Sequence, residues 1–248
     1  MIARSANPGL NKNTFSQVRG FTLSDNLMTL QGTVNKTGIM LFLALLSAMW
    51  VWRQFFVYEA PQISLYLWGG AIGGFIAAMV AIFKPTTAPI VAPVYALLEG
   101  LFLGGISSIM EARFPGIVIQ AVGLTFGTLF ALLFAYKSGL IKATENFKLG
   151  ITAATGGIFL MYMVSFILGF FGTHVPFIHG NGIIGIGISG FIVVIAALNL
   201  VLDFDFIEQG VEQGAPKFME WRAALGLMIT LVWLYIEILH LLSKLRSR

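Results

Sequence analysis

Two acidic side chains, Glu99 and Glu237, lie within stretches of the sequence that are otherwise apolar, and a third, Asp203, stands at the end of such a stretch. An ionisable residue inside a membrane-spanning helix costs at least ~2.5–3.5 kcal/mol on insertion scales, so each one needs a structural or functional reason. Carboxylates can take up and release a proton, and they supply the hard oxygen ligands that calcium prefers. These residues therefore mark a candidate pathway for protons or cations.

The spacing of polar residues in the sixth apolar stretch predicts which of them face inward. Asn199 and Asp203 are four residues apart, so they share one face of a helix. Asp205 follows two positions later, about 200° around the helix axis, and points the other way. We expect Asn199 and Asp203 to line the pathway, and Asp205 to meet water or lipid headgroups.

The last apolar stretch carries its polar side chains on one stripe. Trp233, Glu237, His240 and Lys244 follow one another at spacings of four, three and four residues. Such a stripe on an aliphatic helix must face the bundle interior or a wet cavity. We expect Glu237 and His240 to line the pathway from this side.

Asp203 and Glu237 would act as a unit if the fold brings them together. Two carboxylates at low dielectric cannot both be charged cheaply, so the pair would exchange a proton near neutral pH. Without that proton it would be a transient calcium site. Lys84, at a depth similar to Asp203, could pair with Asp203 as a lock, or it could be a lysine anchor at the membrane surface.

The length of the connection before the last apolar stretch argues against a direct contact between Asp203 and Glu237. In a hairpin that turns at Gly214–Pro216, Asp203 would lie opposite about Gly226. Glu237 would then be ~11 residues, or ~16 Å, farther along the last helix. Pairing requires a turn near Glu220, with part of the connection non-helical.

Seven stretches have the ~20 mostly apolar residues that a spanning helix needs. They are Thr37–Val57, Ile63–Phe83, Ile90–Met110, Ile117–Tyr136, Leu149–Phe171, Ile183–Leu202 and Ala223–Leu242. None alternates with the period of two that a membrane β-barrel requires. The predicted fold is an all-α membrane protein: a seven-helix transmembrane domain (residues 37–248) behind a mobile polar N-terminal tail (residues 1–36).

The composition agrees with solvation by lipid. Hydrophobic residues make up 57% of the 248, against about 45–50% in soluble domains. Charged residues make up 10%, where about 25% is usual. There is no cysteine, which excludes disulfides and thiolate sites. The basic residues lie at the termini and in short connections, so we expect no nucleic-acid partner.

The positive-inside rule predicts the orientation. A cytoplasmic N-terminus places Lys84, Lys217 and most other basic residues of the connections inside, and leaves Arg53 and Arg113 outside. Seven spans then put the C-terminus outside, although a re-entrant last segment would return its basic residues to the inside.

Glycines recur at GxxxG spacing, which lets helix backbones approach closely. The pairs are Gly69/Gly73, Gly70/Gly74, Gly100/Gly104 and Gly123/Gly127. We expect a tightly packed bundle, in which Glu99 either lines the pathway or hydrogen-bonds two helices together.

Residues 187–190 match the GxSG pattern of intramembrane serine proteases, and His240 lies on the next helix. A dyad of Ser189 and His240 is therefore an alternative, but no further group is placed as an oxyanion donor. The HExxH and P-loop motifs are also missing from the sequence. We expect no enzyme activity.

Three motifs resemble those of the Bax inhibitor / YccA-like family, also called the transmembrane Bax inhibitor motif family. Residues 96–101 (ALLEGL) are similar to its third-helix segment, residues 201–204 (VLDF) to its sixth-helix motif, and residues 234–239 (LYIEIL) to its last-helix motif. The opening MTLQGTVNKT, residues 28–37, is typical of one bacterial branch.

The resemblance implies a seven-helix bundle with the last helix at its centre and a carboxylate pair that senses pH and passes calcium. By position, Asp203 and Glu237 would be that pair, and Lys84 would replace a basic residue that locks the aspartate. Glu237 stands where the family often has aspartate, and Lys84 stands where arginine is expected.

We therefore expect a pH-sensitive calcium leak channel in the bacterial inner membrane. Calcium would be the permeant ion, with no tightly bound cofactor. An alternative is a regulatory protein that binds a membrane protease or the stress and cell-death machinery through the tail (residues 1–36) or the acidic insert Glu208–Glu220. A proton-coupled carrier is a third possibility.

Overall fold

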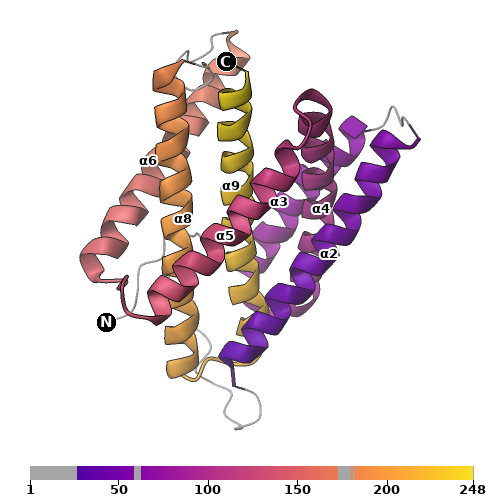
Figure 1. Ribbon diagram of the computed structural model, residues 1–248. Helices are drawn as coiled ribbons and strands as arrows, with labels where there is room; N and C mark the ends of the chain where they lie inside the picture. Colours follow the sequence, from indigo (N-terminus) through magenta and orange to yellow (C-terminus); the bar gives the residue numbers. More distant parts are fainter. Residues whose placement is uncertain (1–26, 59–62, 173–179, 181, 248) are drawn as a thin grey trace. The chain divides into compact units, whose positions relative to one another are not determined.

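The computed structural model describes residues 27–58, 63–172, 180 and 182–247. Within these ranges the chain forms seven long helices, one short 3-10 helix, η2 (Pro85–Thr87), and one isolated β-bridge between Leu27 and Pro216 (Figure 1). The long helices are α2 (Leu30–Phe56), α3 (Ile63–Phe83), α4 (Ala88–Arg113), α5 (Ile117–Lys137), α6 (Glu145–Phe170), α8 (Ile183–Glu212) and α9 (Met219–Arg246). All seven are long and apolar enough to cross a membrane, which confirms the predicted all-α, seven-span fold.

The first helix begins earlier than the sequence predicted. The side chain of Thr29 accepts a hydrogen bond from the backbone N–H of Gly32 and caps the start of α2. Residues 30–36, which we assigned to the polar tail, are therefore helical, because a satisfied N-cap stabilises turns of low hydropathy. Residues 1–26 of the predicted tail (residues 1–36) lie outside the described residues.

The connection between the last two helices is shorter than the sequence predicted. α8 continues to Glu212 and α9 begins at Met219, so most of residues 204–222 are helical. Glu208 and Glu212 interrupt the hydropathy of the chain, but both are exposed, so the helix continues with them on its outer side. Gly214, with a φ of 65°, then ends α8 in the left-handed conformation that glycine accepts readily.

The contacts divide the described chain into two packing units. The first unit contains α2, α3, α4, the end of α8 from Phe206 and the start of α9 to Ile229. The second unit contains α5, α6, α8 up to Asp205 and α9 from Thr230. The last two helices therefore contribute side chains to both units.

In the first unit, α4 packs against both α2 and α3, and glycines make these contacts close. A Cβ atom on Gly70 of α3 would come within 2.6 Å of the carbonyl oxygen of Leu98. A Cβ atom on Gly100 of α4 would come within 2.8 Å of the Cα atom of Ala44. The prediction of tight packing at GxxxG spacing is confirmed for these two helix pairs.

The same prediction is wrong for α5. A Cβ atom on Gly123 or Gly127 would meet no other atom within 4 Å, since both glycines face open space. The buried side of α5 carries Ala121, Thr125 and Leu129, and the glycines are two positions away from that face. GxxxG spacing alone does not show which face of a helix is packed.

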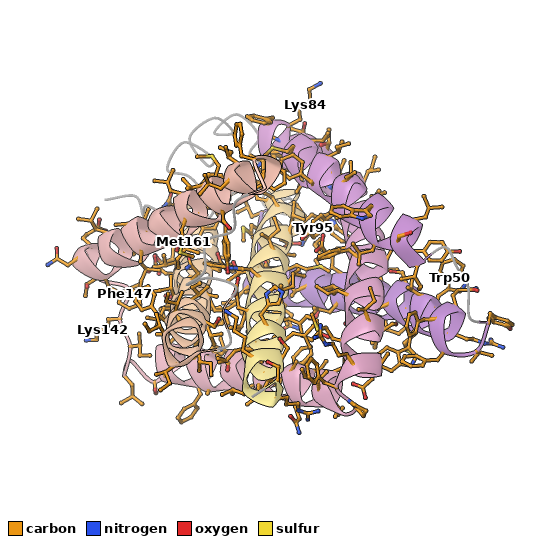
Figure 2. The ribbon with its side chains drawn as sticks, turned by 90° about the horizontal axis from the view of Figure 1, so that it is seen from above. Trp50, Lys84, Tyr95, Lys142, Phe147 and Met161 are labelled. Carbon is orange, nitrogen blue, oxygen red and sulfur yellow. The ribbon has the colours of Figure 1, made fainter. Side chains whose placement is uncertain are left out.

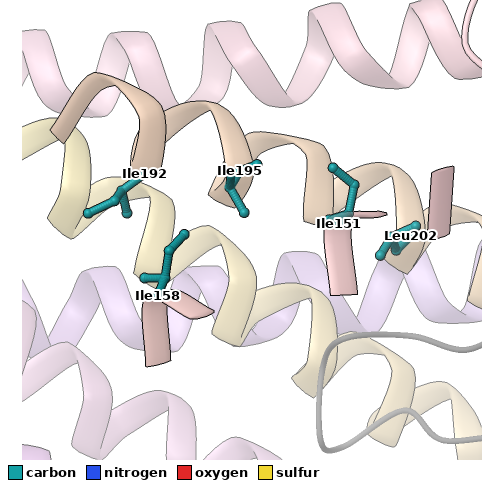
Figure 3. Packing of buried hydrophobic residues seen from close by; sticks show 5 residues of the cluster. All are labelled: Ile151, Ile158, Ile192, Ile195 and Leu202. Atoms are coloured by element: carbon teal, nitrogen blue, oxygen red, sulfur yellow. The ribbon is translucent and has the colours of Figure 1, made fainter. Parts of the chain in front are cut away.

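The second unit has a core of branched aliphatic side chains between α6 and α8 (Figure 3). The core residues are Ile151, Ile158, Ile192, Ile195 and Leu202. Trp233 of α9 packs against them, so three helices meet around this core.

The last helix is the most buried of the seven. Its apolar stretch is 67% buried, against 11–44% for the other six. Many large apolar side chains of the other helices are exposed, as expected where lipid covers the surface. The central position of α9 in a single bundle stays a prediction.

Candidate functional site

Glu237 lies on the buried side of α9 and is only 4% exposed. Its Oε1 atom accepts hydrogen bonds from the hydroxyl of Tyr162, at 2.7 Å, and from the indole N–H of Trp233, at 3.2 Å. Trp233 is one turn away on α9, and Tyr162 comes from α6. The polar stripe predicted for the last helix therefore faces α6 at this level.

Farther along the stripe, Lys244 reaches α8. Its ammonium group donates to the hydroxyl of Ser189, at 2.8 Å, and to the carbonyl oxygen of Gly185, at 3.3 Å. Lys244 also interacts electrostatically with Glu237. Ser189 is 3% exposed, and its hydroxyl is bonded to a lysine, whereas the alternative dyad required a bond to His240. His240 itself is half-buried on the same stripe.

The two inward residues predicted for the sixth span are both buried: Asn199 is 4% exposed and Asp203 is 1% exposed. The side-chain amide of Asn199 donates to the hydroxyl of Thr155 on α6 and to the carbonyl oxygen of Ile195, both at 2.8 Å. The shared face of Asn199 and Asp203 therefore packs against protein, as their spacing predicted.

The prediction for Asp205 is wrong. Its Oδ2 atom lies 2.7 Å from the ammonium group of Lys148, and the two side chains are 15% and 5% exposed. α6 begins at Glu145, so Lys148, which the sequence placed in a connection, lies in the first turn of a spanning helix. A lysine buried there needs a carboxylate partner, and Asp205 turns inward to provide it.

The register of α6 and α8 bears on the proposed pair. Lys148 contacts Asp205, and Thr155 contacts Asn199, so the two helices run antiparallel. Asp203 is then level with about residue 150 of α6, whereas Tyr162, which binds Glu237, is about 12 residues or about 18 Å farther along. The direct pair stays a prediction, and this register argues for two separate carboxylates. Within the described residues, no group of three or more His, Cys, Asp or Glu side chains could hold a metal ion.

Glu99 lies in the first unit, at the contact between α4 and α3. It is 8% exposed and is hydrogen-bonded to the side chain of Tyr95, one turn earlier on α4. A Cβ atom on Gly74 of α3 would come within 2.8 Å of its Oε2 atom. The hydrogen bond to Tyr95 stays within α4, and the carboxylate packs closely against α3, where Gly74 leaves room for it. Whether Glu99 lines a pathway or hydrogen-bonds two helices together stays a prediction.

Lys84 follows the end of α3 and is exposed. Its side chain extends away from the ribbon (Figure 2). The geometry resembles that of an anchor at the membrane surface. Its lock with Asp203, which belongs to the other packing unit, stays a prediction.

Glu220, which the sequence does not single out as a site residue, is fully buried in the first turn of α9. Its carboxylate accepts hydrogen bonds from the backbone N–H and the hydroxyl of Thr29, at 2.8 and 2.9 Å, and forms an ion pair with Lys36. Gly32 leaves the space that the carboxylate occupies. The sequence predicts that Glu220 belongs to an acidic surface insert, but only two glutamates of that insert, Glu208 and Glu212, are exposed.

Arg222, also missed, is 3% exposed. Its guanidinium donates to the carbonyl oxygens of Ala81 and Ile82, at 2.5 and 2.8 Å, and so caps the C-terminal end of α3. The signal in the sequence is that two charged residues, Glu220 and Arg222, stand directly before an apolar stretch. That position fits a surface connection equally well, so the partners could not be read from it.

Comparison with known proteins agrees with the family resemblance of the three sequence motifs, residues 96–101, 201–204 and 234–239. The model of the family described as Bax inhibitor 1 like matches residues 5–247 of the chain. No curated protein and no solved structure matches the sequence or the fold. The match covers essentially the whole length, including all seven spanning helices. The chain belongs to the Bax inhibitor 1 like family.

Proposed function

We propose that the protein is a pH-sensitive calcium leak channel in which Glu237 is the principal ion-binding and proton-binding group. The observation that supports this best is the environment of that carboxylate. It is buried in a spanning helix, and both of its hydrogen-bond donors, Tyr162 and Trp233, are neutral. Neutral donors hold a carboxylate in place without cancelling its charge, so the group keeps its affinity for a cation or a proton.

The second carboxylate of the pathway is Asp203, with Asn199 on the same buried face of α8. Because the register separates it from Glu237, we propose that a calcium ion binds these carboxylates one after the other, with water completing its coordination. Weak, separate sites suit a leak, since conduction requires that each bound ion can leave. In this proposal Glu99 has a structural role at the contact between α3 and α4 and does not bind an ion.

In this proposal the N-terminus is cytoplasmic and the protein lies in the inner membrane of a bacterium. Calcium flux into liposomes that contain only the purified protein tests the function. We expect flux above that of empty liposomes, with a steep dependence on pH near neutrality. Glu237→Gln should flatten the pH profile, whereas Glu212→Gln, an exposed glutamate at the end of α8, should leave it unchanged.

Regulation of a membrane protease or of the stress machinery is the competing function. A regulator without its partner would show no flux at any pH, with or without Glu237. Normal pH dependence in Glu237→Gln would refute the role of this residue.

A further inference from the structure

Three polar side chains of α6 follow one another at intervals of seven residues: Lys148, Thr155 and Tyr162. Seven residues make almost two full turns, about 10 Å, so the three side chains lie on one face of the helix. Lys148 contacts Asp205 at 2.7 Å, and the hydroxyl of Thr155 accepts a hydrogen bond from Asn199 at 2.8 Å. Both partners belong to α8, so these contacts fix the face of α6 that also carries Tyr162.

Farther along this face, Tyr162 reaches α9. Its hydroxyl donates to Oε1 of Glu237 at 2.7 Å, and the indole N–H of Trp233 donates to the same oxygen at 3.2 Å. The bond from Trp233 stays within one helix. The bond from Tyr162 is shorter and joins two helices, so it is the one through which α6 acts on this carboxylate.

A hydrogen bond donated to a carboxylate is stronger when that group is charged than when it is protonated. The donor therefore favours the charged form and makes the proton easier to release. Glu237 is only 4% exposed, so little water competes with the hydroxyl of Tyr162 for its oxygen atom. Removing that hydroxyl leaves the charged form with one donor fewer in a buried place.

We infer that Tyr162 is a positioning residue for Glu237, and that its hydroxyl sets the pH at which this carboxylate exchanges its proton. The inference rests on the proposed function, since it concerns the same site. It makes the pH response of the protein a property of the contact between α6 and α9, and it assigns that control to one neutral group.

Other groups around the site stay constant when position 162 is changed. On α9 itself, Lys244 interacts electrostatically with Glu237, and the half-buried His240 lies on the same stripe. From α8, Ser189 contacts that stripe through a hydroxyl that does not titrate near neutral pH. A comparison of side chains at position 162 therefore isolates the effect of one hydroxyl.

Tyr162→Phe keeps the aromatic ring and removes the hydroxyl. We expect the midpoint of the pH profile of calcium flux to move to higher pH by about one unit, which is a tenfold change in proton affinity. A shift of about this size follows from the loss of one hydrogen bond to a charged group. Flux into liposomes at a series of pH values measures it, and Tyr162→Phe in the Glu237→Gln background should have no further effect.

Tyr66→Phe is the matched control. It removes a hydroxyl from α3, in the other packing unit, and leaves the ring against Trp50 at a centroid distance of 5.0 Å. The midpoint should not move in this variant.

A second side chain at position 162 tests the opposite direction. A monofluorinated tyrosine, introduced at this position alone, keeps the hydroxyl and makes it more acidic, hence a stronger donor to the charged carboxylate. The midpoint should move to lower pH. Looser packing around the ring would not give opposite shifts for two side chains of such similar shape.

Infrared titration of the purified protein gives a readout that needs no flux. A protonated carboxyl group has a carbonyl stretching band that the carboxylate lacks, and the difference between wild type and Glu237→Gln assigns the band to this residue. We expect the band to shift with pH in the same directions as the flux: upward for Tyr162→Phe and downward for the fluorinated side chain.

The outcomes separate this inference from the proposed function. A Glu237 band that titrates at the same pH in all variants would overturn the role of Tyr162, even if the flux profile moves. An equal shift in Tyr66→Phe would also overturn it. A band that shifts as expected in a protein without calcium flux would overturn the proposed channel and leave the role of Tyr162 in proton binding. A band that does not titrate at all would overturn both.

Discussion

Two largely buried lysine–carboxylate pairs hold the first turns of two spanning helices: Lys148 of α6 with Asp205, and Glu220 of α9 with Lys36. The first pair joins α6 to α8, and the second joins α2 to α9. Their energetic value depends on burial, because a lone charge left in such a place has neither water nor a partner. At the scale of single residues, the contribution of each ion pair to the free energy of unfolding can therefore be tested by substitution.

Lys148→Met should lower the free energy of unfolding by about 3 kcal/mol, because it leaves the largely buried Asp205 without its cation. Adding Asp205→Asn should recover part of that loss, since the carboxylate that has lost its lysine is then neutral. Thermal and denaturant unfolding in detergent measure both effects.

Glu145→Gln is the control for the same lysine. The carboxylate of Glu145 lies 3.8 Å from the ammonium group of Lys148, and the Glu145 side chain is 54% exposed. The substitution should therefore change the free energy of unfolding by less than about 0.5 kcal/mol. If the Lys148→Met and Asp205→Asn effects simply add, the two residues are not coupled and the pair does not contribute as described.

The sequence could not predict these pairs, and the reason is physical. Helical periodicity gives the angle between Asp203 and Asp205, but it does not say what packs against each face. Asp205 faces inward because the first turn of α6 brings Lys148 to it. Glu220 is buried because Gly32 leaves space for it. In each case the partner comes from a distant part of the chain.

At the scale of elements, α4 depends on glycine on two sides. Its contacts with α3 and α2 leave no room for a Cβ atom at Gly70 or Gly100.

The hydropathy of the chain was sufficient to predict the spanning helices, since lipid solvation is a local property of each stretch. It failed at residues 204–222, where two exposed glutamates interrupt the apolar run of a helix that continues.

Gly100→Ala should destabilise the protein by about 1–3 kcal/mol, because the added methyl group meets the backbone of Ala44 and α2 must shift. Gly127→Ala is the matched control, since its Cβ atom would meet nothing within 4 Å. It should be neutral or stabilise the helix by up to about 1 kcal/mol. Equal effects at the two positions, measured by thermal unfolding, would contradict the packing of α2 on α4.

At the scale of the whole molecule, α8 and α9 belong to both packing units. Their carboxylates Asp203 and Glu237 both lie in the second unit, yet the register with α6 separates them. Each would then meet a passing ion alone. The motifs in the sequence predicted the two residues, and a turn at Gly214–Pro216 predicted their mismatch. The sequence left a turn near Glu220 open as well, and the structure has its turn at Gly214, between α8 and α9.

Asp203→Asn and Glu237→Gln should therefore have independent effects on calcium flux. We expect the logarithmic changes of the single variants to add in the double variant, as they do for sites that share no partner. Flux assays at several pH values measure this. A double variant no worse than the more affected single variant would restore the direct pair.

The orientation of the molecule gives a further prediction. α9 runs unbroken for 28 residues, about 42 Å, which is longer than the apolar core of a bilayer at about 30 Å. We expect the last helix to cross fully, with the N-terminus inside and the C-terminus outside. A reporter fused after Arg248 that is active in the cytoplasm would require a re-entrant end instead.

The ion pair between Lys36 and Glu220 has a consequence for biosynthesis. The two residues are 184 positions apart, near the two ends of the chain. At about 5–20 residues per second, the ribosome makes Glu220 about 10–40 s after Lys36. During that interval the first spanning helix is already made, but the carboxylate that holds its N-terminal end does not yet exist. Chains that stop before Glu220 would lack the carboxylate partner of Lys36, so the N-terminal part of α2 would be held less firmly in them than in finished molecules.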